Sequence, residues 1–269
     1  SLMHNYFTKA QAFDSFGLIV SGLFGAFLVA RIGFSVIWPV AAASFLASFL
    51  ILTFAKEGYI KRKVKIKEAF KELINQTKRS ANYSYKHHVL FYFLLAGFVA
   101  LFSLNLQANI SWIPLLQSLG MPDYAFGYLW SMIAVVIMVS PLLATKLLKK
   151  GKERNFIILG MVLCALITSL ILFAFNLILA VAVMLGALFF YFAKRPAERV
   201  YFHRFIPSKL RATIGSIEGL ILSIATIISL PLAGILVDKI GARYTIFISA
   251  LVMIPAIIIY LMIKEKRLK

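Results

Sequence analysis

The chain has 269 residues, 61% of them hydrophobic, and a formal net charge of +19 at pH 7. Its mean hydropathy of +0.89 excludes a soluble domain, because a globular fold would have too little polar side chain to cover its surface. A large positive charge in a soluble protein would indicate nucleic-acid binding, but here the basic residues lie between hydrophobic stretches. The composition therefore predicts an integral membrane protein in contact with the lipid bilayer, with no nucleic-acid partner.

Eight stretches are long and apolar enough to cross a bilayer as α-helices, which takes about 20 residues. We expect an all-α, polytopic transmembrane bundle with spans at residues 10–30, 34–54, 89–116, 126–148, 156–175, 177–193, 213–237 and 244–263. Cys164 lies inside one of these stretches and is the only cysteine, so no intramolecular disulfide can form. The chain starts almost directly with a helix, from which we expect a longer native polypeptide.

The connections between the spans alternate between strongly basic and nearly neutral. The basic ones carry net charges of +7 (residues 55–88), +4 (146–154), +5 (194–211) and +3 (264–269), whereas the turns on the other side total about +1. Translocated loops avoid Lys and Arg, so the basic connections and both termini are predicted to be cytoplasmic. The expected location is the plasma membrane or a bacterial inner membrane.

The longest connection, residues 55–88, contains a helical pattern. Ile66, Phe70, Leu73 and Ile74 recur at helical spacing between lysines, which predicts an amphipathic helix on the inner membrane surface. A solvated, charged linker between two bundles is an equally good interpretation. The adjacent His87-His88 pair has no Cys or carboxylate at ligand spacing, so we expect interfacial histidines and no metal.

Two distant spans resemble each other. When the chain is shifted by 208 residues, Ser15–Gly33 aligns with Ser223–Gly241 and seven of the 19 positions are identical. The shared Ser, Gly and basic positions indicate a repeat, because Leu, Ile and Val agree easily by chance between apolar helices. Repeats separated by several spans are typical of transporters built from duplicated halves.

Polar residues interrupt the end of the third span. Asn105, Asn109 and Trp112 fall on one face of a continuous helix, with Gln107 beside them. Amides are costly in hydrocarbon, so we expect them to line a substrate pathway. Interhelical hydrogen bonding is the alternative. In the sixth span, Phe190 and Tyr191 either stack on a flat substrate or pack against neighbouring helices.

Asp14 and Glu218 are the only acidic residues inside the predicted spans, each one to two turns from the cytoplasmic start of its helix. A carboxylate there interacts favourably with the helix dipole. The functional alternative is that it gains and loses a proton in each cycle. No catalytic or phosphate-binding motif occurs in the sequence, so we expect neither an enzyme nor an ATP-driven pump, and no cofactor.

Four features together resemble the major facilitator superfamily. They are the long basic loop after the second span, the basic loop Lys146–Arg154, the run from Phe205 to Thr213 that includes Arg211, and the pattern Gly234-x3-Asp238-x2-Gly241-x-Arg243. The chain resembles helices five to twelve of such a twelve-helix transporter. Two departures are the absence of helices one to four, and the lack of the family's Asp in the Lys146–Arg154 loop.

The resemblance implies three regions: the last two helices of an N-terminal bundle (1–54), a basic linker (55–88) and a complete six-helix C-terminal bundle (89–269). It also implies a conformational latch, in which Asp14 pairs with Lys149, Lys150, Lys152 or Arg154. In the same latch, Glu218 would pair with a partner in the missing half. Ser21-Gly22-Leu-Phe-Gly25-Ala26 lies where drug–proton antiporters of the family carry a Gly-Pro-x-x-Gly-Gly run, although the Pro is missing here.

The function predicted on these grounds is secondary active transport of a small solute by alternating access. Efflux of a drug-like or amphipathic molecule is favoured, coupled to an ion gradient in which H⁺ is the candidate ion. The alternative is a truncated scaffold or sensor that keeps the fold but does not transport.

Overall fold

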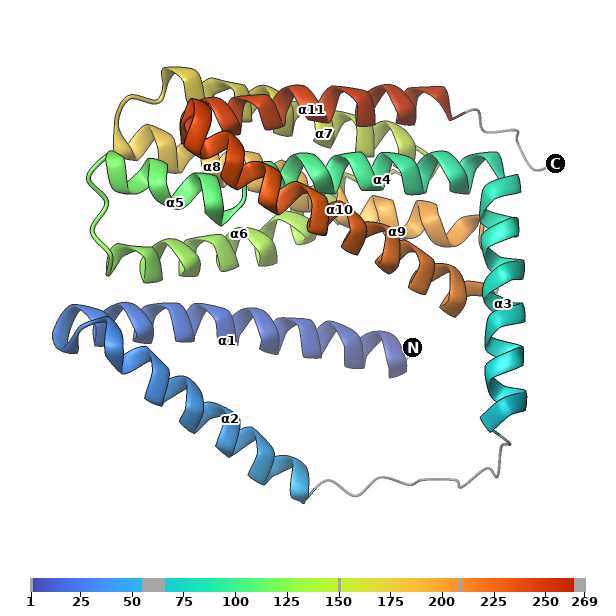
Figure 1. The fold of residues 1–269 in the computed structure, drawn as a ribbon, viewed down its shortest axis with the longest axis horizontal. Coiled ribbons are helices and arrows are strands. Elements are labelled where there is room, and N and C mark those ends of the chain that lie inside the picture. Colours follow the sequence, from blue (N-terminus) through green and yellow to red (C-terminus); the bar gives the residue numbers. More distant parts are fainter. Residues whose placement is uncertain (1, 55–65, 150, 208–209, 264–269) are drawn as a thin grey trace. The chain divides into compact units, whose positions relative to one another are not determined.

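The computed structural model describes the backbone of residues 2–54, 66–149, 151–207 and 210–263, and the side chains of these ranges except residues 2–15, 66–73 and 76. Every regular element in these ranges is helical (Figure 1). The α-helices are α1 (Leu2–Ile32), α2 (Ile37–Thr53), α3 (Ile66–Lys86), α4 (His88–Leu106), α5 (Asn109–Ser118), α6 (Ala125–Leu147), α7 (Glu153–Ser169), α8 (Leu177–Ala193), α9 (Arg195–Arg204), α10 (Arg211–Ile240) and α11 (Ala242–Met262). Two short 3₁₀ helices, η1 (Phe34–Val36) and η2 (Leu170–Phe173), lie in the turns.

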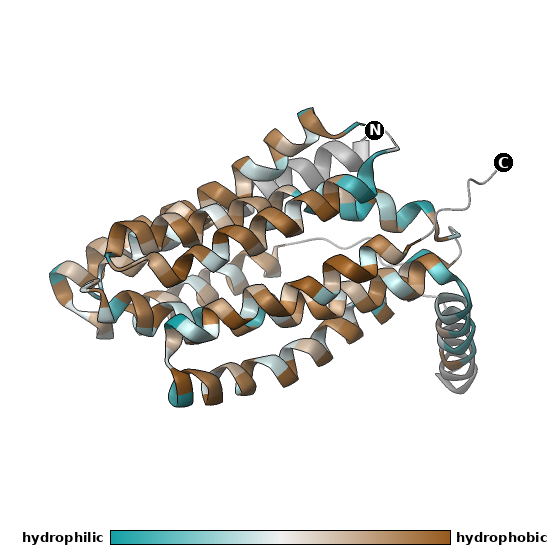
Figure 2. Ribbon diagram, turned by 90° about the horizontal axis from the view of Figure 1, so that it is seen from above, coloured by the Kyte–Doolittle hydropathy of each residue, from teal (hydrophilic) through white to brown (hydrophobic). Residues whose placement is uncertain are grey.

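Seven helical segments of the described residues are long and apolar enough to span a membrane. They are Phe34–Thr53, His88–Ser118, Ala125–Leu147, Glu153–Phe173, Leu177–Arg204, Arg211–Ile240 and Ala242–Met262, and hydrophobic residues predominate along them (Figure 2). The predicted 10–30 span falls on α1, whose described apolar part, Phe16–Ile32, is shorter. The prediction of an all-α, polytopic membrane fold is confirmed.

The third span is not one continuous helix. α4 ends at Leu106, Ala108 has extended backbone angles, and α5 starts at Asn109. Local bonds stabilise the break: the Ala108 amide donates to the Asn105 carbonyl (3.1 Å), and the Ser111 hydroxyl donates to the Leu106 carbonyl (2.6 Å). The prediction that Asn105, Asn109 and Trp112 share one helical face is therefore wrong, because they belong to two different helices.

The predicted loop at residues 194–211 contains a helix, α9 (Arg195–Arg204). The sixth span was expected to end at residue 193, but Lys194 is both the C-cap of α8 and the N-cap of α9. Pro196 in the first turn of α9 has no backbone N–H to donate, which suits a helix start and interrupts the preceding helix. The charged residues expected in a loop thus lie on a helix.

The chain separates into two units. The first comprises residues up to Glu72 together with Pro122–Val135, and the second comprises Leu73–Met121 and Val136 onward. In the first unit, α1 contacts the start of α6 closely: the Ser131 hydroxyl donates to the Ile19 carbonyl (3.1 Å), and a Cβ added to Gly127 would lie 2.6 Å from the Ala26 Cβ. Glycine at this crossing is what allows the two backbones to approach.

The second unit has an extensive hydrophobic core. α4 lies against α10 and α11, and α7 packs on α8 and α11 (Figure 1). Its largest fully buried side chains include Tyr201, Tyr260, Phe202 and, unusually for a core, Lys194. Phe93 of α4 stacks on Phe202 with ring centroids 4.9 Å apart. This packing holds the polar groups described next.

Candidate functional site

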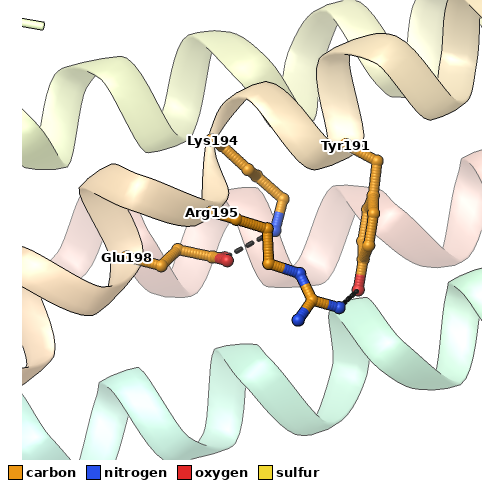
Figure 3. A network of polar contacts seen from close by, with 4 residues as sticks. All are labelled: Tyr191, Lys194, Arg195 and Glu198. Carbon is orange, nitrogen blue, oxygen red and sulfur yellow. Dashed lines mark hydrogen bonds and ion pairs between the residues drawn. The ribbon is translucent and has the colours of Figure 1, made fainter. Parts of the chain in front are cut away.

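The junction between α8 and α9 places two cations and a carboxylate at least partly inside the second unit. Tyr191, Lys194, Arg195 and Glu198 follow one another on neighbouring helical turns (Figure 3). The Glu198 amide donates to the Lys194 carbonyl (3.0 Å), so helical backbone bonding continues through the junction. The i, i+4 spacing brings the side chains of Lys194 and Glu198 to the same face.

Lys194 is 2% exposed, which requires a partner for its charge. Its ammonium group lies 2.5 Å from Glu198 Oε1 and 4.4 Å from the centroid of the Tyr191 ring. A carboxylate and an aromatic face thus replace the water that the ammonium loses on burial.

A second ion pair joins α9 to α10. The Arg199 guanidinium donates to Glu218 Oε2 at 2.9 Å, and the glutamate side chain is 15% exposed. Farther along α9, Arg204 pairs with the buried Glu153 at the start of α7. These two pairs attach α9 to two neighbouring helices.

Arg195 differs from these residues. Its guanidinium lies 3.4 Å from the Tyr191 hydroxyl and above the Tyr191 and Phe192 rings, at 5.3 and 5.6 Å from their centroids. Among the described residues, no carboxylate is within ion-pair distance of it. Arg195 is therefore a partly buried cation in direct contact with aromatic groups, and Glu198 and Glu218 interact with its charge from a greater distance.

One cavity of about 120 Å³, which we call the Arg195 cavity, is lined by the charged residues Lys194, Arg195, Glu198, Arg199 and Glu218. Residues of α4, α8, α9, α10 and α11 surround it: Phe93, Gly97, Ala100, Leu101, Tyr191, Lys194, Arg195, Glu198, Arg199, Glu218, Leu222 and Tyr260. Tyr260 is 1% exposed, and its hydroxyl has no hydrogen-bond partner in the described part of the chain. The cavity combines a charged side with an apolar side.

The predicted pathway residues of the third span lie elsewhere. Asn105 donates to the Thr226 hydroxyl of α10 (3.0 Å), which is the interhelical alternative. Gln107 and Trp112 are buried, at 4% and 5% exposure, whereas Asn109 is exposed. None of the four lines the Arg195 cavity.

Of the other predicted residues, Tyr191 and Glu218 line the cavity, while Phe190 is partly buried against the hydrophobic core. Arg154 donates to the Tyr260 and Leu261 carbonyls (2.9 and 2.7 Å). It therefore provides hydrogen-bond donors for two carbonyl groups at the C-terminal end of α11. Arg211 is exposed. Lys150 and the Asp14 side chain lie outside the described residues.

The predicted loop pattern has a structural role in this conformation. Arg243 donates to the Ile171 and Ala174 carbonyls (2.8 and 2.7 Å) and thereby fixes the turn between α7 and α8. Gly241 has φ 84° and ψ 158°, a conformation restricted to glycine. Asp238 is exposed, and a Cβ on Gly234 would meet nothing within 4 Å.

Sequence reasoning missed Lys194, Arg195, Glu198 and Arg199 because they follow an apolar run and were assigned to a loop. The i, i+4 spacing of Lys194 and Glu198, next to Tyr191, was the signal that could have identified them. The described residues contain no cluster of three His, Cys, Asp or Glu side chains that could hold a metal ion. His87 Nδ1 instead accepts from the Leu90 amide at the start of α4 (3.5 Å).

The apolar helices and the charged interior cavity define a multi-pass α-helical membrane protein. A family model described as Major Facilitator Superfamily matches residues 6–217, more than half of the chain. The chain therefore belongs to the Major Facilitator Superfamily, whose members are transporters that bind small-molecule substrates in a membrane. No curated protein and no solved structure matches it.

Proposed function

We propose that this protein is a secondary active transporter that moves a small amphipathic solute by alternating access. The observation that carries the proposal is membership of a transporter superfamily by a chain whose second unit contains a charged cavity among membrane-spanning helices. A polar solute cannot cross hydrocarbon unless protein groups replace its water. Rocking of helical bundles around a central site supplies such groups without a continuous pore.

Ion coupling is part of the proposal, with H⁺ as the candidate ion and efflux as the favoured direction. Glu198 and Glu218 are the two carboxylates that line the Arg195 cavity, and each is paired with a cation. Protonation of either one would remove an ion pair that joins helical turns or helices. That change links proton binding to helix packing, which is what coupled transport requires.

The regional and topological predictions remain proposals. We propose that residues 1–54 belong to an N-terminal bundle, 55–88 to a cytoplasmic linker and 89–269 to a six-helix bundle, with both termini in the cytoplasm of a plasma or inner membrane. The support for this topology is the concentration of Lys and Arg in one set of connections. Because Cys164 is the only cysteine and is buried, single cysteines placed in those connections would report accessibility cleanly.

The direct test is flux across proteoliposomes that contain the native polypeptide. A panel of amphipathic solutes of positive, zero and negative charge would be loaded, and a pH gradient imposed. We expect gradient-dependent flux of at least one charge class, abolished by an uncoupler. A folded protein that supports no flux of any class, with or without a gradient, would reject transport and favour the scaffold or sensor alternative.

A further inference from the structure

The second unit carries an apolar groove at the corner between α3, α4 and α10, which we call the α3 groove. Its volume is about 360 Å³, whereas an apolar cavity of about 150 Å³ holds a benzene molecule. Apart from Ser84 and Tyr85 of α3, its lining side chains consist of hydrocarbon only. Tyr85, Phe91 and Leu95 are 73%, 38% and 39% exposed, so the groove opens onto the outside of the helical bundle.

The arrangement of α3 and α4 places the groove at the edge of the bilayer. α4 begins the membrane-spanning segment His88–Ser118, and α3 runs across its start instead of continuing it (Figure 1). Two contacts fix this corner. The Tyr83 hydroxyl donates to the Phe205 carbonyl (3.2 Å), and the rings of Tyr85 and Phe91 meet edge to face with centroids 5.6 Å apart. The groove therefore begins at the membrane–water boundary and follows the first turns of a span into the hydrocarbon.

The hydroxyl of Ser84 is an unsatisfied polar group in this groove. Ser84 is 4% exposed and lines the groove, and its Oγ has no hydrogen-bond partner among the described residues. Buried hydroxyls are nearly always bonded, so this donor indicates a ligand that brings an acceptor. The ester carbonyls of phospholipids lie at the boundary between headgroups and hydrocarbon, and such a carbonyl accepts without donating.

The helix that borders the groove is basic. Residues 73–122 contain no Asp or Glu, and their Lys and Arg residues, which are Lys78, Arg79 and Lys86, all lie on α3. Lys78 is exposed and precedes Ala81 of the groove by three residues, so it lies on the groove side of the helix. Arg79 is turned about 100° farther from the groove. Lysines at the membrane surface attract anionic headgroups.

We infer that the α3 groove binds one anionic phospholipid of the bilayer. One acyl chain lies against Phe98 and Ile221, which continue the apolar wall. Phe98 is ten residues beyond His88, about 15 Å along the helix axis, which suits an acyl chain. An ester carbonyl of the lipid accepts from Ser84, and the headgroup phosphate lies near Lys78. A second copy of this chain, with its net charge of +19, would instead repel that lysine. The inference requires a bilayer but not transport, so it goes beyond the proposed function.

The test is native mass spectrometry of the native polypeptide in detergent, titrated with dioleoyl phosphatidylglycerol or with phosphatidylcholine of the same acyl chains. Wild type is expected to retain one phosphatidylglycerol about fivefold more tightly than phosphatidylcholine. Lys78→Gln should lower the phosphatidylglycerol affinity about fivefold, the effect of one basic residue at a membrane surface. Arg79→Gln removes the same charge from the neighbouring exposed position and should leave the affinity unchanged.

Ser84→Ala separates lipid binding from folding. It deletes a hydroxyl that has no partner in the described structure, so thermal stability in lipid-free detergent should be unchanged or higher. Affinity for ester-linked phosphatidylglycerol should fall about fivefold, whereas an ether-linked analogue, which lacks the carbonyl, should bind wild type and variant equally. Ala81→Trp fills the groove from an exposed position and should abolish retention. Asn82→Trp adds the same side chain at the next exposed residue and should not.

Three results would overturn the inference. Equal affinity of wild type for the two headgroups, or equal losses in Lys78→Gln and Arg79→Gln, would leave only a general attraction of lipid to a basic surface. Unchanged retention in Ala81→Trp would show that the lipid binds elsewhere. A dimer that forms in wild type without lipid and is lost in Ala81→Trp would assign the groove to a second copy of the chain.

Discussion

α1 and α10 are the two copies of the sequence repeat, and they have the same local structure in different surroundings. The Gly33 amide donates to the Val29 carbonyl (3.0 Å), and at the equivalent positions the Gly241 amide donates to Val237 (2.9 Å). Both glycines have positive φ, 99° and 84°. The hydroxyls of Ser21 and Ser229 also bond the carbonyl three residues earlier. The turn and these bonds are local, so each copy reproduces them.

Burial differs between the copies. α10 buries Ile214, Ala225, Ser229 and Ala233, and its successor α11 buries seven residues. Among the described side chains of the first copy, α1 buries Ala26 alone and α2 buries none. Burial requires neighbouring helices, and the second unit supplies them. The comparison teaches that the repeat fixes turns and helix ends, while the surrounding unit determines which faces become core.

The largest effect is expected at the buried ion pair between Lys194 and Glu198 in the second unit. The first copy offers no such pair among its described side chains, since Arg31 is the only charged residue of α1 and α2 there. Glu198→Gln leaves Lys194 buried and unpaired and should lower the free energy of unfolding by about 3–5 kcal/mol. Replacing both, as Lys194→Met with Glu198→Leu, should restore much of that stability. Denaturant titration in detergent measures both; equal losses in the single and double variants would contradict the ion-pair explanation.

The next effect concerns Arg243, whose equivalent in the first copy is Ser35. Arg243→Ala removes two charged hydrogen bonds to the turn after α7 and should cost about 3 kcal/mol. Ser35→Ala, the matched control on η1, should cost less than about 0.5 kcal/mol. Thermal unfolding of both variants would decide whether the second copy alone depends on this position.

A smaller effect is expected at the turn glycines themselves. Alanine at Gly241 or Gly33 must adopt a backbone conformation that only glycine tolerates, at a cost of about 1–3 kcal/mol. The local cost should be similar in the two copies because the angles are similar. If Gly241→Ala is as stable as wild type, the positive φ is not required by the turn.

The smallest effects distinguish two glycine positions within the helices. A Cβ on Gly22 would lie 2.8 Å from the Gly127 carbonyl oxygen, so Gly22→Ala should destabilise by about 1–2 kcal/mol through overpacking. Gly234 has open space around it, so Gly234→Ala should stabilise by up to about 1 kcal/mol through helix propensity. The same melting experiment compares the two, and equal shifts would contradict the close contact of α1 with α6.

The sequence alone determined the membrane class, the approximate positions of the spans and the two glycine turns. Each depends on a local property: a long apolar run needs a bilayer, and a positive φ needs glycine. Two of the predicted residues, Tyr191 and Glu218, proved to line the charged cavity. The resemblance to the superfamily came from loop patterns, and the family model, which matches residues 6–217, shows the same superfamily.

Only the tertiary structure decided the rest. The break at Gln107 is accompanied by side-chain bonds from α4 to distant helices, from Asn105 to Thr226 and from Ser103 to the Ser249 carbonyl, and no local pattern specifies them. The burial of Lys194 is likewise set by the helices packed around it, since the same Lys-Arg-Pro-Ala-Glu-Arg run would be solvated if it were a loop. Whether a charge belongs to a surface or to a site depends on which distant residues exclude water from it, and that is a property of packing, not of sequence order.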